Sequence, residues 1–490
     1  MSDQNQEEME SAGTESNRPF TTRAVSRREF LKIAGVAGAA MGLSAGLGGV
    51  LAACGEEEAT TTTTTTAGEA TTTTAAASTT TASAGPEMGR EIKIGLVSPQ
   101  TGALASFAVA DEWWVNYALA ALPDGIVCGD GKQHMFNIIR TDSQSDSNRA
   151  AQVAGDLATN DGVDMLMASG SPDTVNPVAD QAEALGVPCL SNWVPWQPFF
   201  FGRGATPDKP FKWTYTHAIG IEDIFSNFIA MWDQIPTNKV VGMFFANDAD
   251  GQAFVDPVAG FPPIAEAAGY KPVFPGLYTV GTEDFTKEIS EFKKAGCDIS
   301  CAVITPPDYS NYWKQAVQQG FNPKLDTVGK ALLFPQTAES VGPIAYNATV
   351  ELAWHPSYPF ADSITGLTCQ QLADDFEAKT NSQWTGPLSQ YAKFEWAVDV
   401  YKRSDPEDKE SVIAAVASTK LDTCLGPIDF TAPEDMTDPL NRHPVKNCIK
   451  SPSGGGQWVK GSKYEFDLTP VSNANSPEIP LAAKVEEVQY

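Results

Sequence analysis

Positively charged side chains are scarce in this 490-residue sequence. It contains 33 Lys and Arg against 61 Asp and Glu, which gives a formal net charge of -28. Nucleic acids and anionic lipid surfaces are themselves negative and repel a chain of this composition. We therefore expect neither of them as a partner.

Motifs of the common enzyme classes are also lacking. Beyond residue 53 there is no GxSxG, HExxH or CxxCH motif, and no GxGxxG follows a predicted strand. The four histidines are scattered, and the pair Cys297 and Cys301 has no histidine or second cysteine pair nearby. We expect no catalytic residue, no metal and no cofactor. An extracytoplasmic enzyme is the less favoured alternative.

Apolar runs rich in Leu, Ile and Val, which a membrane span requires, are lacking as well. The one long apolar stretch is dominated by Gly and Ala, follows the paired arginines of Ser26–Lys32, and ends at Leu51–Cys54. This arrangement resembles a twin-arginine export signal joined to a lipoprotein cleavage site. We expect residues 1–53 to be removed and Cys54 to carry a lipid anchor in the membrane. The protein would then lie at the extracytoplasmic face of the cell membrane, at the cell surface or in the periplasm.

Residues 54–88 contain no aromatic side chain and almost no large aliphatic one. Runs of Thr broken by Ala, Ser and Gly make up most of this segment. Such a composition buries too little apolar surface to offset the entropy of ordering. We expect a disordered tether.

From residue 91 the pattern becomes that of a folded α/β protein. Short runs that are apolar on both faces alternate with helical segments, which predicts parallel sheets with right-handed crossovers. The pattern restarts near residue 222, so we predict two doubly wound lobes joined by a hinge. The predicted strands are residues 92–98, 135–140, 163–168 and 187–191 in the first run, and 240–245, 272–278 and 299–304 in the second.

Helical segments follow the two α/β runs late in the chain, and this order predicts that the chain crosses between the lobes several times. We assign residues 91–217 and 356–424 to lobe 1, and residues 218–355 and 425–490 to lobe 2. Gly454–Gly456 predicts the turn of a late β-hairpin. Besides Cys54 there are seven cysteines, an odd number, and we favour a disulfide between Cys424 and Cys448.

Several short segments resemble the type I solute-binding proteins of ABC importers, specifically the leucine/isoleucine/valine-binding family. They occur in a consistent order between residues 91 and 450: Ile94–Gly102, Asp142–Asp146, Ala168–Pro177, Gly186–Pro188, Asn247–Gly251 and Leu425–Phe430. The resemblance implies a periplasmic binding protein type I fold and no reaction. It further implies a monomer whose lobes close on a small polar solute, an amino acid or a related amide or carboxylate, and an ABC permease as partner. A sensor component that passes ligand to a signalling partner is the main alternative.

The resemblance also implies which loops hold the ligand. The expected ligand-binding residues are Gln100, Ser169, Gly170, Ser171, Ser191, Asn192, Trp193, Val194, Asp250, Thr305, Pro306 and Gln336. Ser171–Asp173 has the sequence of a helix N-terminus, whose free N–H groups bind an anion. Alternatively, Ser171 only caps the helix and Asp173 already satisfies the helix dipole.

Two positions depart from the family pattern. Asp250 stands where members for aliphatic amino acids have a Tyr, and Gln336 stands where they have a Glu that pairs with the ligand ammonium. A neutral amide holds an ammonium less well than a carboxylate does. Either Asp250, with Asp308 as a substitute, makes this pairing, or the ligand has no α-ammonium.

Overall fold

Two large β-sheets organise the described part of the chain, which in this computed structural model comprises residues 85–257 and 259–490. The first sheet is parallel throughout, with the strand order β15, β7, β6, β5, β1, β4. Its strands are β1 (Ile92–Ser98), β4 (Phe136–Asp142), β5 (Met165–Ala168), β6 (Cys189–Asn192), β7 (Thr214–His217) and β15 (Cys448–Ile449). The expected signal peptide and nearly all of the expected tether lie outside the described residues.

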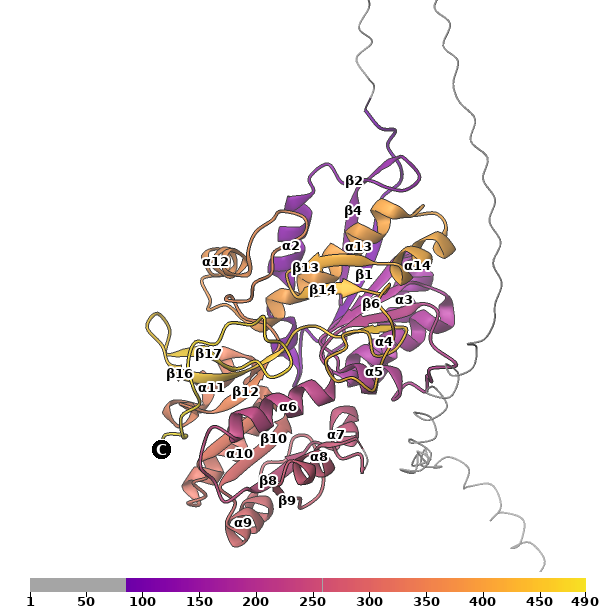
Figure 1. Cartoon of the computed structure of the whole chain (residues 1–490). Helices are drawn as coiled ribbons and strands as arrows, with labels where there is room; N and C mark the ends of the chain where they lie inside the picture. The colour runs from indigo at the N-terminus through magenta and orange to yellow at the C-terminus, as the bar shows by residue number, and fades with distance from the viewer. Residues whose placement is uncertain (1–84, 258) are drawn as a thin grey trace, which may run out of the picture. The chain divides into compact units, whose positions relative to one another are not determined.

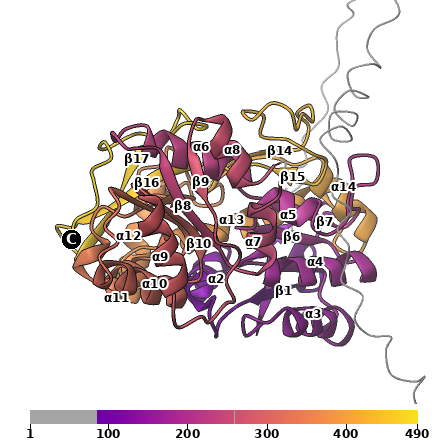
Figure 2. The same cartoon turned by 90° about the horizontal axis from the view of Figure 1, so that it is seen from below.

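Both faces of the first sheet are buried by helices. Along β5, Met165 and Met167 pack into one core and Leu166 packs into another. The covering helices are α2 (Asp111–Ala121) and α13 (Ala392–Arg403) on the first face, and α3 (Ser147–Asp156) and α4 (Pro172–Leu185) on the second (Figure 2). Burial on two faces is the reason that the central strands β1 and β5 have apolar residues on both sides.

The second sheet has the strand order β17, β16, β12, β11, β10, β8, β9. It is parallel from β9 to β12, and β16 and β17 add to it antiparallel. Its strands are β8 (Val240–Phe245), β9 (Lys271–Val273), β10 (Ile299–Ile304), β11 (Leu325–Lys330), β12 (Thr349–Leu352), β16 (Gly454–Lys460) and β17 (Phe466–Ser472). Helices α6 (Ile221–Trp232) and α8 (Phe261–Ala267) cover one face, and α9 (Thr286–Ala295) and α10 (Pro306–Gln318) cover the other.

The chain passes between the two sheets three times (Figure 1). Strand β7 leads into α6, β12 leads into α12 (Cys369–Thr380), and β15 leads into β16. We call the parts built on the first and second sheets lobe 1 and lobe 2. Because β15 pairs with β7, the chain stays with lobe 1 up to Ile449. The last crossing therefore lies at residues 450–453 and not at the expected boundary between residues 424 and 425.

The late hairpin forms, but Gly454–Gly456 does not turn it. These glycines begin β16, and the turn to β17 follows Lys460. A Cβ at Gly455 would lie 2.6 Å from Met231 Sδ, and one at Gly456 would lie 2.8 Å from Leu468 Cδ1. The predicted turn is wrong. These glycines lie within a strand, where the absence of a side chain lets Met231 and Leu468 pack directly against the backbone.

The predicted disulfide is also wrong. All seven cysteines of the described residues, Cys424 and Cys448 among them, are buried free thiols. Both partners lie in apolar cores, where a thiol packs as a small hydrophobic side chain. Among the helices of residues 85–257 and 259–490, none is long and apolar enough to cross a membrane.

Candidate ligand-binding cleft

A cavity of about 50 Å³ is lined by residues from both lobes. Loops that follow β5 and β6 contribute from lobe 1, and strands β10, β11 and β12 contribute from lobe 2. The crossing segments also reach it, through Ala218, Ile219, Ala353 and Ser451. The cavity thus lies at the ends of parallel strands and beside the hinge, which is a favoured place for a ligand.

Helix α4 of lobe 1 begins at this cavity. Gly170 has a φ of 127°, and a Cβ there would lie 2.5 Å from Thr174 Oγ1, so the loop requires glycine. Ser171 is the N-cap, and its hydroxyl donates to Asp173 Oδ2 at 3.5 Å. Asp173 Oδ1 accepts the Ala249 N–H of lobe 2 at 3.2 Å. A carboxylate therefore already faces the α4 N-terminus, and it bridges the lobes.

A buried lysine lies on the lobe 2 side. Lys330, the last residue of β11, has its Nζ 2.9 Å from Asp248 Oδ2 and 2.9 Å from Asp250 Oδ2. Its φ of 65° and ψ of -61° are strained for a residue with a side chain. Burial acts to lower the pKa of Lys330, but the carboxylates of Asp250, Asp248 and Asp173 outweigh it and raise the pKa. The lysine is therefore charged.

Asp173, Asp248 and Asp250 form an acidic cluster across the lobes. Single carboxylate oxygens of the three lie within 4.8 Å of one another. Burial raises the pKa of Asp250 to about 6, although Lys330 opposes this, and burial with Asp248 raises the pKa of Asp173. Oxygen clusters of this kind suit a hard cation. Here the Lys330 ammonium already contacts two of the three, and the absence of a metal stays a prediction.

Glu351 of β12 adds a fourth acidic group. Its Oε1 accepts the backbone N–H of Lys330 at 2.9 Å, whereas its buried Oε2 has no hydrogen-bond partner among the described residues. Burial raises the pKa of Glu351 to about 8, so the carboxyl group is mostly protonated at neutral pH. A Cβ at Gly329 would lie 3.0 Å from this Oε2. Gly329 therefore leaves the room that the carboxyl group needs.

Aromatic side chains form the apolar wall of the cavity. Trp193 has a φ of 63°, and its Nε1 donates to Ser389 Oγ at 3.1 Å. A Cβ at Gly386 would lie 2.6 Å from the Trp193 ring, so this packing also depends on a glycine. Phe107 of lobe 1 makes edge-to-face contacts with Trp193 and with Phe334 of lobe 2, at centroid distances of 6.2 and 5.0 Å. The wall therefore joins the lobes.

A second, open depression of about 460 Å³ is lined by residues that precede and follow Phe107 in the sequence. Phe107 lines the cavity, while its neighbours Ser106 and Ala108 line this depression, together with Gln100 and Gln336. The two glutamines expected at the ligand therefore lie near each other, but outside the cavity.

The structure brings four expected ligand residues to the cavity: Gly170, Ser171, Trp193 and Asp250. Six others do not line it: Ser169, Ser191, Asn192, Val194, Thr305 and Pro306. Ser169 accepts a hydrogen bond from the buried Lys393 of α13, and burial lowers the pKa of that lysine to about 7. Thr305 and Pro306 begin α10, whose Asp308 accepts a bond from the Tyr278 hydroxyl at 3.1 Å. Asp308, the expected substitute for Asp250, does not line this cavity either.

Sequence reasoning did not include Lys330, Glu351 or Asp248 in the site. Lys330 and Glu351 are charged residues in strands whose residues are all buried. A charged residue in a predicted strand was the available signal for these two site residues. Buried charges are rare unless they are paired, so each of them indicates a partner.

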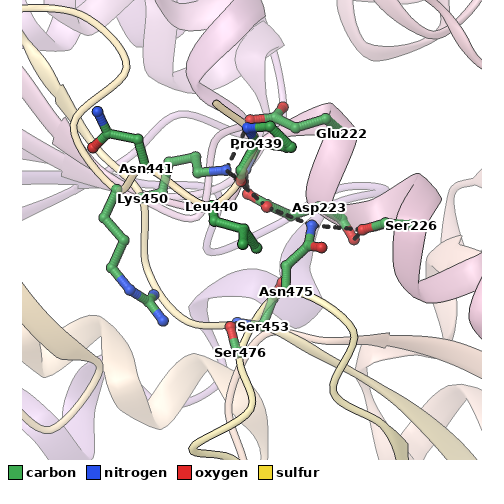
Figure 3. Close-up of polar contacts among 12 residues, drawn as sticks. Glu222, Asp223, Ser226, Pro439, Leu440, Asn441, Lys450, Ser453, Asn475 and Ser476 are labelled. Atoms are coloured by element: carbon green, nitrogen blue, oxygen red, sulfur yellow. Dashed lines mark hydrogen bonds and ion pairs between the residues drawn. The ribbon is translucent and has the colours of Figure 1, made fainter. Parts of the chain in front are cut away.

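Another buried lysine, Lys450, lies at the hinge (Figure 3). Lys450 Nζ donates to Asp223 Oδ1 at 2.8 Å, to Glu222 Oε1 at 3.0 Å and to the Pro439 carbonyl at 2.6 Å. Asn475 Nδ2 donates to the same Asp223 oxygen at 2.9 Å. Glu222 also accepts the Trp196 Nε1–H at 3.1 Å. The first and third crossings are thus tied to each other and to the loop that carries Trp193.

Comparison with known proteins places this geometry in context. A sequence profile described as periplasmic binding protein matches residues 91–442, and a twin-arginine signal profile matches residues 24–44. None of the curated proteins compared with the chain matches its sequence.

Solved structures share the fold at low identity. A type 1 periplasmic binding protein from Bordetella pertussis has a TM-score of 0.63 and 18% identity, covering 78% of this chain and 100% of its own. A leucine-binding protein from Thermotoga maritima gives 0.62 and 16%, over 78% and 99%. A solute-binding protein of an ABC transporter from Rhodopseudomonas palustris, solved with 3,4-dihydroxybenzoic acid, gives 0.61 and 16%, over 81% and 98%.

These matches agree with the two parallel-sheet lobes and their three crossings. The fold is that of a type I periplasmic binding protein, and the twin-arginine profile indicates export from the cytoplasm. Because the profile covers well over half of its length, the chain belongs to the periplasmic binding protein family.

Proposed function

We propose that this protein is the solute-binding component of an ABC importer and that it captures a small polar solute in the cavity between its lobes. The observation that carries the proposal is one cavity lined by both lobes, with Gly170, Ser171 and Trp193 from lobe 1 and the ionisable residues Asp250, Lys330 and Glu351 from lobe 2. A site divided between two lobes needs their closure in order to be complete.

The lobes themselves supply a mechanism for capture. The hydrogen bond from Ala249 to Asp173 and the contact between Phe107 and Phe334 exist only while the lobes are together. A solute that contacts both lobes adds to these interactions and binds the closed form more tightly than the open one. The closed form would then dock on a membrane permease and release its solute there.

An amino acid, or a related amide or carboxylate, is the solute class that the family resemblance favours. The relatives that share the fold include a leucine-binding protein and a protein solved with 3,4-dihydroxybenzoic acid. These two classes of compound are therefore the first to test.

Lipid anchoring at Cys54 completes the proposal. The twin-arginine profile ends shortly before Leu51–Cys54, which has the form of a lipoprotein cleavage site. An anchored monomer would stay close to its permease. Mass spectrometry of the exported protein should find an acylated Cys54 at its N-terminus, and an unmodified, soluble mature form would contradict the anchor.

Ligand screening and uptake together test the function. A ligand at 100 times its dissociation constant adds about 2.7 kcal/mol to stability, which a thermal-shift screen detects. Deleting the gene should then reduce cellular uptake of the same ligand. Unchanged uptake combined with a lost signalling response would favour the sensor alternative.

A further inference from the structure

The ammonium of Lys330 retains an unused hydrogen-bond donor at the cavity. An ammonium has three N–H groups. Two of them bond Asp248 and Asp250, and within residues 85–257 and 259–490 the third has no acceptor. Lys330 lines the cavity and is 5% exposed, so an acceptor for this N–H has to be a molecule inside the cavity.

Glu351 offers a second unused donor at the same cavity. Its Oε1 accepts the Lys330 backbone N–H, whereas its buried Oε2 has no partner in the described part of the chain. Burial, together with the nearby Asp250 carboxylate, raises the pKa of Glu351 to about 8, so the carboxyl group is mostly protonated at neutral pH. A carboxyl group that accepts a bond at Oε1 donates its proton from Oε2. A buried donor without an acceptor is unfavourable, and a ligand acceptor at this position would remove that penalty.

Apolar side chains line other sides of the cavity. They include the rings of Phe107, Trp193 and Phe254 and the aliphatic side chains of Ile219, Val303 and Leu333. A few polar groups in an apolar pocket fix the orientation of a ligand. The donors of Lys330 and Glu351 lie on neighbouring parallel strands, β11 and β12, and can take this part.

The charges at the cavity favour an uncharged ligand. A cation would meet the Lys330 ammonium, which belongs to the lining, whereas Asp173 and Asp248 do not line the cavity. An anion would meet the Asp250 carboxylate in the lining, and single oxygens of Asp173 and Asp248 lie within 4.8 Å of that carboxylate. An uncharged acceptor meets neither repulsion.

The size of the cavity limits the ligand further. At about 10–15 Å³ for each water-sized atom, a cavity of about 50 Å³ holds roughly four non-hydrogen atoms. Both donors line this small volume, so a single ligand group can reach the two of them. A carbonyl oxygen suits this place, because it has two lone pairs and can accept from both.

We propose that the cavity binds a small uncharged carbonyl compound, whose oxygen accepts one hydrogen bond from Lys330 Nζ and one from Glu351 Oε2. The proposal rests on the proposed function, because it names the class of solute that this cavity captures.

Calorimetric titration of the full chain with four planar probes of nearly equal size tests the proposal. Acetone and acetamide are uncharged carbonyl compounds, acetate is an anion and guanidinium is a cation. Acetone and acetamide should bind at least about ten-fold more tightly than the two ions. Tighter binding of acetate or guanidinium would overturn the uncharged class while leaving solute capture intact. Failure of both acetone and acetamide to bind at about 20 mM would overturn it too, whereas the ligand screen and the uptake measurement judge solute capture independently.

Variants at the two donors locate the binding. Lys330→Met and Glu351→Met each remove one donor, so each should weaken acetamide binding about ten-fold. Lys294→Met is the matched control for Lys330→Met, because it removes an exposed lysine of α9 that does not line the cavity. Acetamide affinities equal to that of Lys294→Met in both donor variants would reject the site.

Glu351→Gln separates a donor at this position from an acceptor. Its amide oxygen can accept the Lys330 backbone N–H in place of Oε1, and its NH2 group then donates in place of Oε2. Acetamide should therefore bind Glu351→Gln nearly as tightly as the wild type. A loss as large as that of Glu351→Met would show that Glu351 does not donate to the ligand and would overturn the proposal. Thermal unfolding of every variant confirms that the measured protein is folded.

Discussion

Two buried lysines in this molecule have similar partners and different surroundings. Lys330 in the cleft and Lys450 at the hinge each contact two carboxylates at 2.8 to 3.0 Å. At the hinge the third N–H of Lys450 has an acceptor, the Pro439 carbonyl. In the cleft the third N–H of Lys330 has none among the described residues, and Glu351 leaves an oxygen unpaired.

This difference indicates that the polar groups at the hinge form a structural network, whereas those in the cleft form a site with unused hydrogen-bonding groups. Asp223 accepts bonds from Lys450, Asn475 and the Gly220 backbone, so every partner at the hinge is fixed by the chain itself. A fully bonded network holds one arrangement. In the cleft, one N–H of Lys330 and the Oε2 side of the Glu351 carboxyl group have no partner among the described residues, which leaves room for a group from outside the chain.

The largest expected effect tests the hinge half of this comparison. Lys450→Met leaves the carboxylates of Glu222 and Asp223 buried without their cation, which costs about 3–5 kcal/mol of unfolding free energy. Lys446→Met changes an exposed lysine in the same segment and should cost little. Urea unfolding of both variants measures the difference. Equal stabilities would mean that the hinge network is as dispensable as a surface charge.

Much of the fold was predictable because it follows from local patterns. Strands apolar on both faces indicate parallel sheets, and the structure has them in both lobes. The turn predicted at Gly454–Gly456 was wrong because a run of glycines is found both in turns and where side chains pack closely against a strand. The predicted disulfide between Cys424 and Cys448 was wrong because their separation along the sequence does not determine how far apart they lie in the fold.

The charge cluster in the cleft was harder to predict for a physical reason. Asp173 and Lys330 come from different lobes, and only the tertiary fold brings them together. The helix-start pattern at Ser171 was visible in the sequence, including the role of Asp173 at the helix dipole. That the same carboxylate also bonds the N–H of Ala249 follows only from the structure.

An intermediate effect tests the cleft half of the comparison. Lys330→Met leaves the carboxylates of Asp248 and Asp250 without their cation, but Asp250, whose pKa is already about 6, can take up a proton, so the loss of unfolding free energy should be about 1–3 kcal/mol. Urea unfolding of the variant and of the wild type measures this change. A loss as large as that of Lys450→Met would mean that the cleft is as much a structural network as the hinge.

The smallest expected effect is a pH dependence of stability. Burial raises the pKa of Asp250 from 3.8 to about 6, so the folded state binds this proton more tightly than the unfolded chain does, and stability is lost as the pH rises through this pKa. The groups around it are Asp173, Asp248, Lys330 and Glu351. Between pH 6 and pH 7 the part of the unfolding free energy due to Asp250 should fall by about 0.4 kcal/mol. Urea unfolding at both pH values should show a fall smaller by this amount in Asp250→Asn, and an equal fall there would assign the titration to another group of the cleft.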